Sequence, residues 1–141
     1  MNIEELYKKL TDAEVPEDRF YLHGLFGSTD DNDKLAVTIY RKGNRTYYEV
    51  YFKERGISST LKIFLNENEA CDYVFEKLIY ERDLSRINKI EGLSGMTINE
   101  RLFVSQLMDE FDKARIMDKR RAKEILSLLQ VDQATIDKIV M

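Results

Sequence analysis

The sequence predicts an α+β protein in which an antiparallel β-meander of three to four strands packs with helices and is followed by a helical C-terminal part. Two features of the apolar pattern carry this prediction. Much of the segment 35–65 alternates between apolar and polar side chains, with the period of two that half-buried strands require. After residue 65 the period changes to about 3.6 residues, that of an amphipathic helix. Strands followed by helices favour an α+β arrangement over alternating βαβ units.

The size of the chain predicts a single domain over residues 1–141. Of its 141 residues, 43% are hydrophobic, which is enough to build a core. Within this domain we expect an α+β part over residues 1–96 and a helical subdomain over residues 97–141. No run of about 18 apolar residues is present, and the acidic start is unlike a signal peptide. We therefore expect a cytoplasmic protein that makes no membrane contact.

The strands are predicted from the alternating segments and from the turns that separate these segments. Residues 35–40 and 47–52 alternate on either side of Lys42-Gly43-Asn44, which tolerates positive φ, so they predict a β-hairpin. A glycine turn at Arg55-Gly56 leads into a third strand over residues 59–65. The short apolar stretch 20–26 would add a fourth strand, although its glycines weaken that prediction.

Helices are predicted where a capping residue precedes a 3.6-residue period. A first helix covers about residues 3–10, and a connection containing two glycines covers residues 84–96. The residues that cap the predicted helices are Asn2, Asn66, Thr97, Asp118 and Asp132.

The helix that starts at Thr97 is expected to continue past residue 111 and to bury one apolar stripe. That stripe consists of Phe103, Val104, Leu107, Phe111 and Ala114. Ile98 and Leu102 then fall on the opposite side of the helix. Either the segment 84–96 folds over these two residues, or they belong to a partner surface.

The charge balance argues against a protein that grips a phosphate backbone. The formal net charge is −4, and all the excess acid lies in residues 1–80, which hold 15 acidic and 11 basic residues. Such a surface suits a basic protein partner, or it serves solubility. The run from Lys119 to Lys123 is interpreted as the one basic cluster and as the solvated side of a helix, since Ala122 and Ile125 supply a buried side.

Few residues of this chain support a metal site or a catalytic centre. One cysteine, Cys71, and one histidine, His23, exclude a disulfide and a Cys/His zinc site. Cys71 falls on an apolar helix face, where we expect an inert core residue. The acidic run Asp30, Asp31 and Asp33 lacks the glycine and the final glutamate of a calcium loop, so a solvated turn is favoured. We therefore expect no metal, no cofactor and no enzymatic activity.

Two alternative functions remain beside a protein-binding role. The first is a small enzyme or ligand-binding domain with a pocket between the sheet and the helical tail, where Glu49, Glu54 and His23 would supply acid and base. Carboxylates are so common in this chain that such pairs arise by chance. The second is a nucleic-acid adaptor, which would need the basic surroundings that RNA-binding sheets carry and this sheet lacks.

The predicted sheet places three tyrosines on one face. Alternation sends Tyr40, Tyr47 and Tyr51 to the same side as Glu49. Two interpretations fit: a further helix covers this face and makes the tyrosines core residues, or the face contacts another protein. Tyrosine suits the second role because it supplies a large contact area with few rotatable bonds.

Three segments carry recognisable motifs. An aromatic strand over residues 48–56 ends in E-R-G, residues 64–75 contain an E-x-x-A-C helix start, and residues 95–112 contain G-x-T-x-N-E-R-L followed by D-E-F-D. Together they resemble the immunity proteins of bacterial polymorphic toxin and contact-dependent growth inhibition systems. The resemblance covers roughly residues 48–114.

This resemblance implies a small cytoplasmic protein that binds the C-terminal domain of one cognate toxin, often a nuclease such as an RNase, and blocks it by direct contact. We expect a monomer in a one-to-one complex, with no direct contact to nucleic acid. Because the substrate groove of a nuclease is basic, an acidic inhibitor would gain affinity and speed of association. The candidate toxin-contact residues are Asp30, Asp31, Asp33, Tyr47, Glu49, Tyr51, Glu67 and Asp72.

Overall fold

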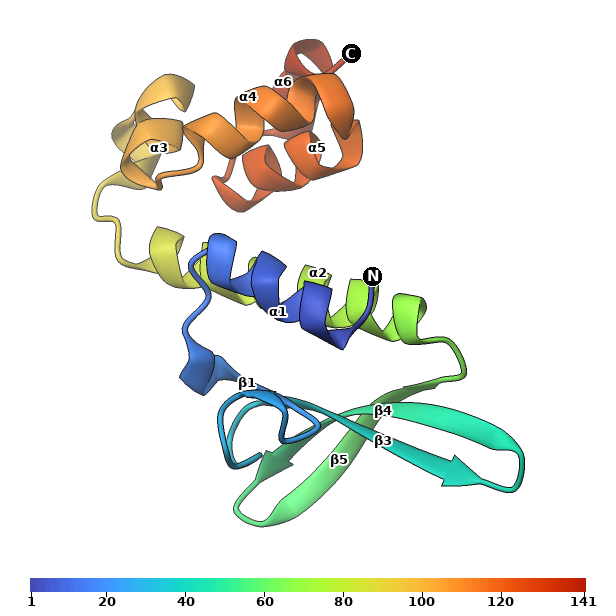
Figure 1. The fold of residues 1–141 in the computed structure, drawn as a ribbon. Helices are drawn as coiled ribbons and strands as arrows, with labels where there is room; N and C mark the ends of the chain where they lie inside the picture. Colours follow the sequence, from blue (N-terminus) through green and yellow to red (C-terminus); the bar gives the residue numbers. More distant parts are fainter. The chain divides into compact units, whose positions relative to one another are not determined.

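The computed structural model describes all residues from Met1 to Met141 as two compact units, Met1–Tyr80 and Glu81–Met141 (Figure 1). The first unit contains α1 (Ile3–Asp12), the 3-10 turn η1 (Glu17–Arg19), β1 (Phe20–Leu22), β2 (Phe26–Gly27), β3 (Leu35–Lys42), β4 (Arg45–Glu54), β5 (Ile57–Phe64) and the larger part of α2 (Glu67–Asn88). The second unit contains the end of α2, η2 (Leu93–Gly95), α3 (Ile98–Val104), α4 (Met108–Met117), α5 (Lys119–Leu128) and α6 (Gln133–Ile139). The division therefore falls inside α2 and not between residues 96 and 97.

The sheet has five strands in the order β2-β1-β3-β4-β5. β3, β4 and β5 form the antiparallel meander that the alternating pattern predicts. β1 runs parallel to β3, and β2 pairs antiparallel with β1. The prediction of a purely antiparallel meander of three to four strands is therefore wrong, because the sheet is mixed. β1 and β2 are too short to show a period of two, and the connection over residues 23–34 has the dozen residues that parallel pairing requires.

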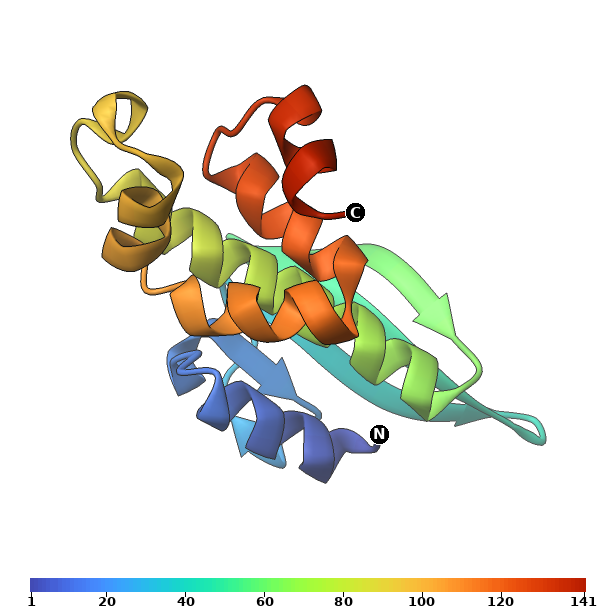
Figure 2. The ribbon, with the colours of Figure 1, turned by 90° about the horizontal axis from the view of Figure 1, so that it is seen from above.

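The core of the first unit lies between the sheet and two helices. Figure 1 and the view from above in Figure 2 show α1 and the first part of α2 lying across one face of the sheet. The buried side chains of this core include Leu6 and Leu10 of α1, Val74 and Leu78 of α2, and Phe20, Leu22, Val37 and Val50 of the sheet. Cys71 is also buried here, and burial raises the pKa of its thiol to about 11, so the expectation of a core residue is confirmed.

The predicted helix starts are confirmed by their caps. Asn2 and Thr97 each form a complete capping box, with Glu5 and Glu100 answering at the third position. The side chains of Asn66, Asp118 and Asp132 each accept a hydrogen bond from the backbone N–H three residues later. The end of α2 differs from the prediction, because the helix runs to Asn88 and the connection is correspondingly shorter.

The predicted apolar stripe in the second unit is wrong at its first two residues. Phe103 is 75% exposed and Val104 is 41% exposed, whereas Leu102 is buried in the core and Ile98 packs against it. The reason is that the helix ends at Val104. Gln106 adopts a positive φ of 64°, and Leu107 returns a hydrogen bond to the carbonyl of Leu102, which is the Schellman ending of a helix.

The core of the second unit is formed by apolar side chains from all of its helices. Its buried members include Ile87, Leu93, Leu102, Leu107, Phe111, Ala114, Ala122, Ile125, Leu126, Leu129 and Ile136. None of the six α-helices of the chain has the length and apolar character that a membrane crossing requires.

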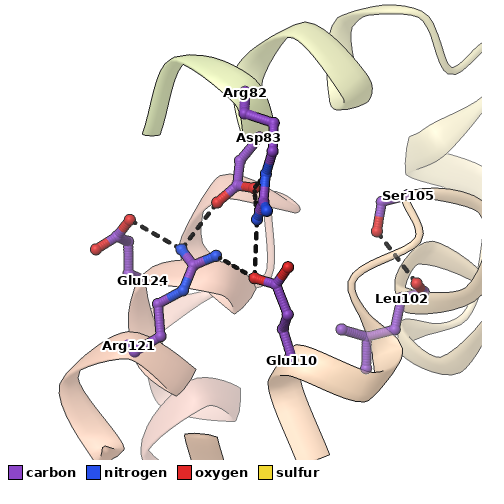
Figure 3. A network of polar contacts seen from close by, with 7 residues as sticks. All are labelled: Arg82, Asp83, Leu102, Ser105, Glu110, Arg121 and Glu124. Carbon is purple, nitrogen blue, oxygen red and sulfur yellow. Dashed lines mark hydrogen bonds and ion pairs between the residues drawn. The ribbon is translucent and has the colours of Figure 1, made fainter. Parts of the chain in front are cut away.

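A network of charges around the buried Asp83 connects three helices of this unit (Figure 3). The carboxylate of Asp83 on α2 is fully buried and lies 2.8 Å from Arg82 and 2.8 Å from Arg121 of α5. Glu110 of α4 bonds the same two guanidinium groups, at 2.8 Å and 2.9 Å. Burial alone would raise the pKa of Glu110, but the hydrogen bonds from the two arginines outweigh burial and hold that pKa below its usual range. The prediction of a solvated face over residues 119–123 is therefore wrong for Arg121.

Candidate functional site

One face of the sheet carries no helix of the first unit. It lies opposite α1 and α2 (Figure 1), and its side chains alternate with the buried Val37 and Val50. We call this surface the open face. The strand register places five side chains on it, Thr38, Tyr40, Tyr47, Glu49 and Ile63, and the exposed Leu61 lies next to them at the bulge of β5. Within the first unit, no helix covers the tyrosines of this face. The alternation that sends Tyr40, Tyr47 and Glu49 to one side is confirmed.

The centre of the open face is an aromatic pair. Tyr40 and Tyr47 lie directly opposite each other on β3 and β4, and their rings stack with centroids 5.4 Å apart and an interplanar angle of 20°. Tyr40 is 37% exposed and Tyr47 is half-buried. Such a cross-strand pair stabilises a hairpin by about 0.2–1 kcal/mol, and it also presents a large amphipathic surface to solvent.

Beside the aromatic pair lie one carboxylate and two exposed aliphatic side chains. Glu49 accepts a hydrogen bond of 2.5 Å from the hydroxyl of Thr60, and Ile63 lies opposite Glu49 in the strand register. Leu61 and Ile63 are 45% and 48% exposed, and both belong to β5, the edge strand of the sheet. Aromatic and aliphatic groups around few charges are typical of the centre of a protein–protein interface.

Tyr51 does not belong to the exposed part of this face, so the expectation that it is an accessible contact residue is wrong. It is only 7% exposed, and its hydroxyl donates a 2.7 Å hydrogen bond to Asp31. Asp31 also pairs with Lys53 at 3.4 Å. Burial raises the pKa of Tyr51, and the bond to Asp31 raises it further; the same bond lowers the pKa of Asp31. These contacts hold the loop over residues 28–34 against β4.

Asp30 and Asp33 also make contacts that stabilise this loop. Asp30 accepts a hydrogen bond from the backbone of Asn32 at 3.0 Å and pairs with Lys34 at 3.3 Å. Asp33 is exposed and adopts a positive φ of 55°, and its N–H donates to the carbonyl of Lys53 at 2.7 Å. The segment is a turn, as predicted, and nowhere in the chain do three or more His, Cys, Asp or Glu side chains come together as a metal site would require.

The candidate contact residues therefore lie in three separate places. Tyr47 and Glu49 share the open face, while the aspartates occupy the loop before β3. Glu67 and Asp72 lie on α2, the helix that covers the other face of the sheet. Glu67 is half-buried and Asp72 is exposed.

The residues of the enzymatic alternative do not form an acid–base pair. Glu49 and Glu54 are five residues apart on β4, which places them on opposite faces and roughly 17 Å apart along the strand. The Nδ1 atom of His23 accepts a 3.0 Å hydrogen bond from the backbone N–H of Ile39, a structural role at the end of β1. A shallow depression lies at the turn between β4 and β5, lined by Glu54, Arg55, Ile57 and Ser59.

Two sets of surface residues are not predicted from the sequence. Leu61 and Ile63 are exposed because β5 is an edge strand, which is a property of the sheet order and leaves no local signal. The second set is a basic cluster of Arg41, Lys42 and Arg45 at the tip of the β3–β4 hairpin, so the run from Lys119 to Lys123 is not the one basic cluster. The signal for the hairpin cluster was present, because the segment 38–48 contains no acidic residue.

The contact between Tyr51 and Asp31 predicts a pH-dependent stability. Because the folded protein holds the pKa of Asp31 below its ordinary value of 3.8, the stabilisation is complete above that value and is lost as the pH falls below it. We expect Asp31→Asn to lower the free energy of unfolding by about 1 kcal/mol at neutral pH. We also expect the difference between the two proteins to shrink below about pH 4. Urea unfolding between about pH 7 and pH 2 measures both effects. A difference that stays constant over this range would contradict the prediction.

Comparison of the chain with protein-family models, with curated proteins and with solved structures gave no match in any of the three.

Proposed function

We propose that this protein is an immunity protein, which binds and neutralises the C-terminal domain of a cognate toxin from a contact-dependent inhibition system. The toxin domain is a nuclease in this proposal, and inhibition follows from direct contact without any reaction catalysed by the chain. The observation that carries the proposal is the open face, where the stacked Tyr40 and Tyr47 lie beside the exposed Leu61 and Ile63. Residues of these types, grouped in this way, dominate the energetics of protein–protein interfaces.

The residues of the motifs that carry the resemblance mainly stabilise the fold. They therefore support this proposal through a similar fold more than through similar contact residues. Glu100 completes a capping box, and the guanidinium of Arg101 donates to four backbone carbonyls. In the D-E-F-D motif, Glu110 belongs to the charge network around Asp83 and Phe111 to the core. Residues that determine which toxin is bound are then expected outside these structural positions. Tyr40, Leu61 and Ile63 meet this expectation.

The distribution of charge also supports a basic partner. The first unit, Met1–Tyr80, holds 15 acidic and 11 basic residues, a balance of −4, whereas the second unit holds 11 of each. Exposed carboxylates such as Asp33 and Asp72 contribute to this field. A field of this sign accelerates the association with a domain whose substrate groove must attract phosphates.

The experiment that tests the proposal is a calorimetric titration with the toxin domain encoded immediately upstream, produced as a catalytically inactive variant. We expect one-to-one binding of nanomolar strength, and protection of the target of the active toxin. Tyr47→Ala is expected to weaken binding about 30-fold or more, which is the effect of removing a hot-spot side chain. Absence of both heat and protection would refute the proposal.

A matched control is available in Tyr80, an equally large side chain that is 44% exposed on α2 and lies away from the open face. Tyr80→Ala is expected to change the affinity by less than about threefold. Equal effects of the two alanine substitutions would remove the open face from the binding surface.

A further inference from the structure

The tip of the β3–β4 hairpin concentrates positive charge in an acidic unit. Arg41, Lys42 and Arg45 are all exposed, and the segment 38–48 around them contains no acidic residue. Figures 1 and 2 both show this hairpin extending beyond α1 and the start of α2. The unit that carries this tip has a net charge of −4. The tip is therefore opposite in sign to the rest of its unit.

The three basic side chains have no partner within the chain. No hydrogen bond or ion pair engages them, whereas Lys34 and Lys53 of the same unit pair with Asp30 and Asp31. The strand register places Lys42 directly opposite Arg45. Like charges in this arrangement destabilise a hairpin, and no carboxylate of the chain pairs with them to offset the repulsion. A local conflict of this kind is typical of a surface that serves binding.

The turn and an aromatic pair stabilise the hairpin behind its basic tip. Gly43 takes the positive φ of 65° at the first turn position, as a type II′ turn requires, and the stacked Tyr40 and Tyr47 lie just behind the tip. The three cationic groups are thus attached to an ordered backbone before any partner binds, which reduces the entropy lost on binding.

We infer that this tip binds a patch of carboxylates on the toxin domain, an inference that rests on the proposed function. Arginine pairs with carboxylates in a bidentate geometry. A polyanion such as RNA fits less well, because three charges neutralise at most three phosphates and the unit as a whole repels phosphate. The interface then has two electrostatic parts, Glu49 at its centre and the basic tip at its end. Such an arrangement permits only one orientation of the bound domain.

The test compares two triple charge reversals by calorimetric titration with the inactive toxin domain. One variant is R41E/K42E/R45E, and its control is K89E/K113E/K119E, which changes three exposed lysines of the second unit. Each lowers the formal net charge by six, from −4 to −10, so the overall charge is matched. We expect the hairpin variant to bind about 100-fold more weakly than the wild type, and the control to differ from it by less than about fivefold. The loss at the hairpin should shrink as salt rises from about 0.05 M to about 0.5 M.

The destabilising effect of the Lys42–Arg45 pair is measured separately with Lys42→Glu. This substitution replaces a like-charged cross-strand pair by an oppositely charged one and should raise the melting temperature. If the wild type binds and both triple variants bind equally well, the inference is refuted while the proposed function stands. If the wild type does not bind the toxin domain, both fall together. A labelled single-stranded RNA is titrated in parallel. Binding of that RNA by the wild type, lost in the hairpin variant while toxin affinity is unchanged, would overturn the assignment to carboxylates.

Discussion

Leu102→Ala is expected to lower the free energy of unfolding by about 2–5 kcal/mol, while Phe103→Ala leaves it within about 0.5 kcal/mol of the wild type. Leu102 is only 1% exposed and packs in the core of the second unit, so its truncation leaves a cavity. Phe103, the larger side chain, is 75% exposed and loses little buried area. Urea unfolding of the two variants, followed by circular dichroism, measures both effects.

The two adjacent substitutions serve as controls for each other, because both shorten a side chain of α3 without changing its caps. A stripe that continued through Phe103 and Val104 would produce the reverse order of effects. A larger loss for Phe103→Ala than for Leu102→Ala would therefore show that the helix continues past Val104.

Asp83→Ala is expected to destabilise the second unit by about 3–5 kcal/mol. The Asp83 carboxylate is fully buried and lies 2.8 Å from each of two guanidinium groups, those of Arg82 and Arg121. Removal of the carboxylate leaves two largely buried cations with Glu110 as their main remaining partner (Figure 3). The cost arises because both guanidinium groups lose a buried counter-charge, and it exceeds what the intact network contributes. Chemical denaturation measures the loss in free energy of unfolding, provided that the unfolding of the second unit is followed by a signal of its own.

Glu124→Ala is the matched control for this prediction. Glu124 bonds the same Arg121 at 3.1 Å, but its side chain is 37% exposed, so water replaces it when it is removed. We expect this variant to lose less than about 1 kcal/mol. Comparable losses for Asp83→Ala and Glu124→Ala would show that burial does not control the cost.

Part of the candidate site is predictable from the sequence because it depends on strand alternation. Tyr40, Tyr47 and Glu49 share a face in any hairpin with this turn, since side chains in a strand alternate with a strict period of two. Tyr51 obeys the same rule but is buried, because the loop carrying Asp31 folds against it. Alternation assigns a side chain to a face, whereas its exposure depends on what else packs there.

The charged residues show the same limit. Arg121 lies in a basic run that is typical of a solvated helix face, yet its guanidinium is the partner of the buried Asp83. A sequence signal for this pair did exist. Ile79, Asp83 and Ile87 follow one another at intervals of four on α2, so the aspartate sits within an apolar stripe.

By itself, the sequence determined the helix starts, the β3–β4–β5 meander and the change from strands to helices. Capping boxes, turn glycines and apolar periods act between residues a few positions apart, so they are readable along the chain. The tertiary structure alone decided that β1 joins the sheet parallel to β3, that α3 ends at Val104 through Gln106 in place of the usual glycine, and which charges are buried. The pairing of β1 with β3 and the burial of Asp83 against Arg121 depend on contacts between segments distant in the sequence. The free energy of such contacts outweighs local preference.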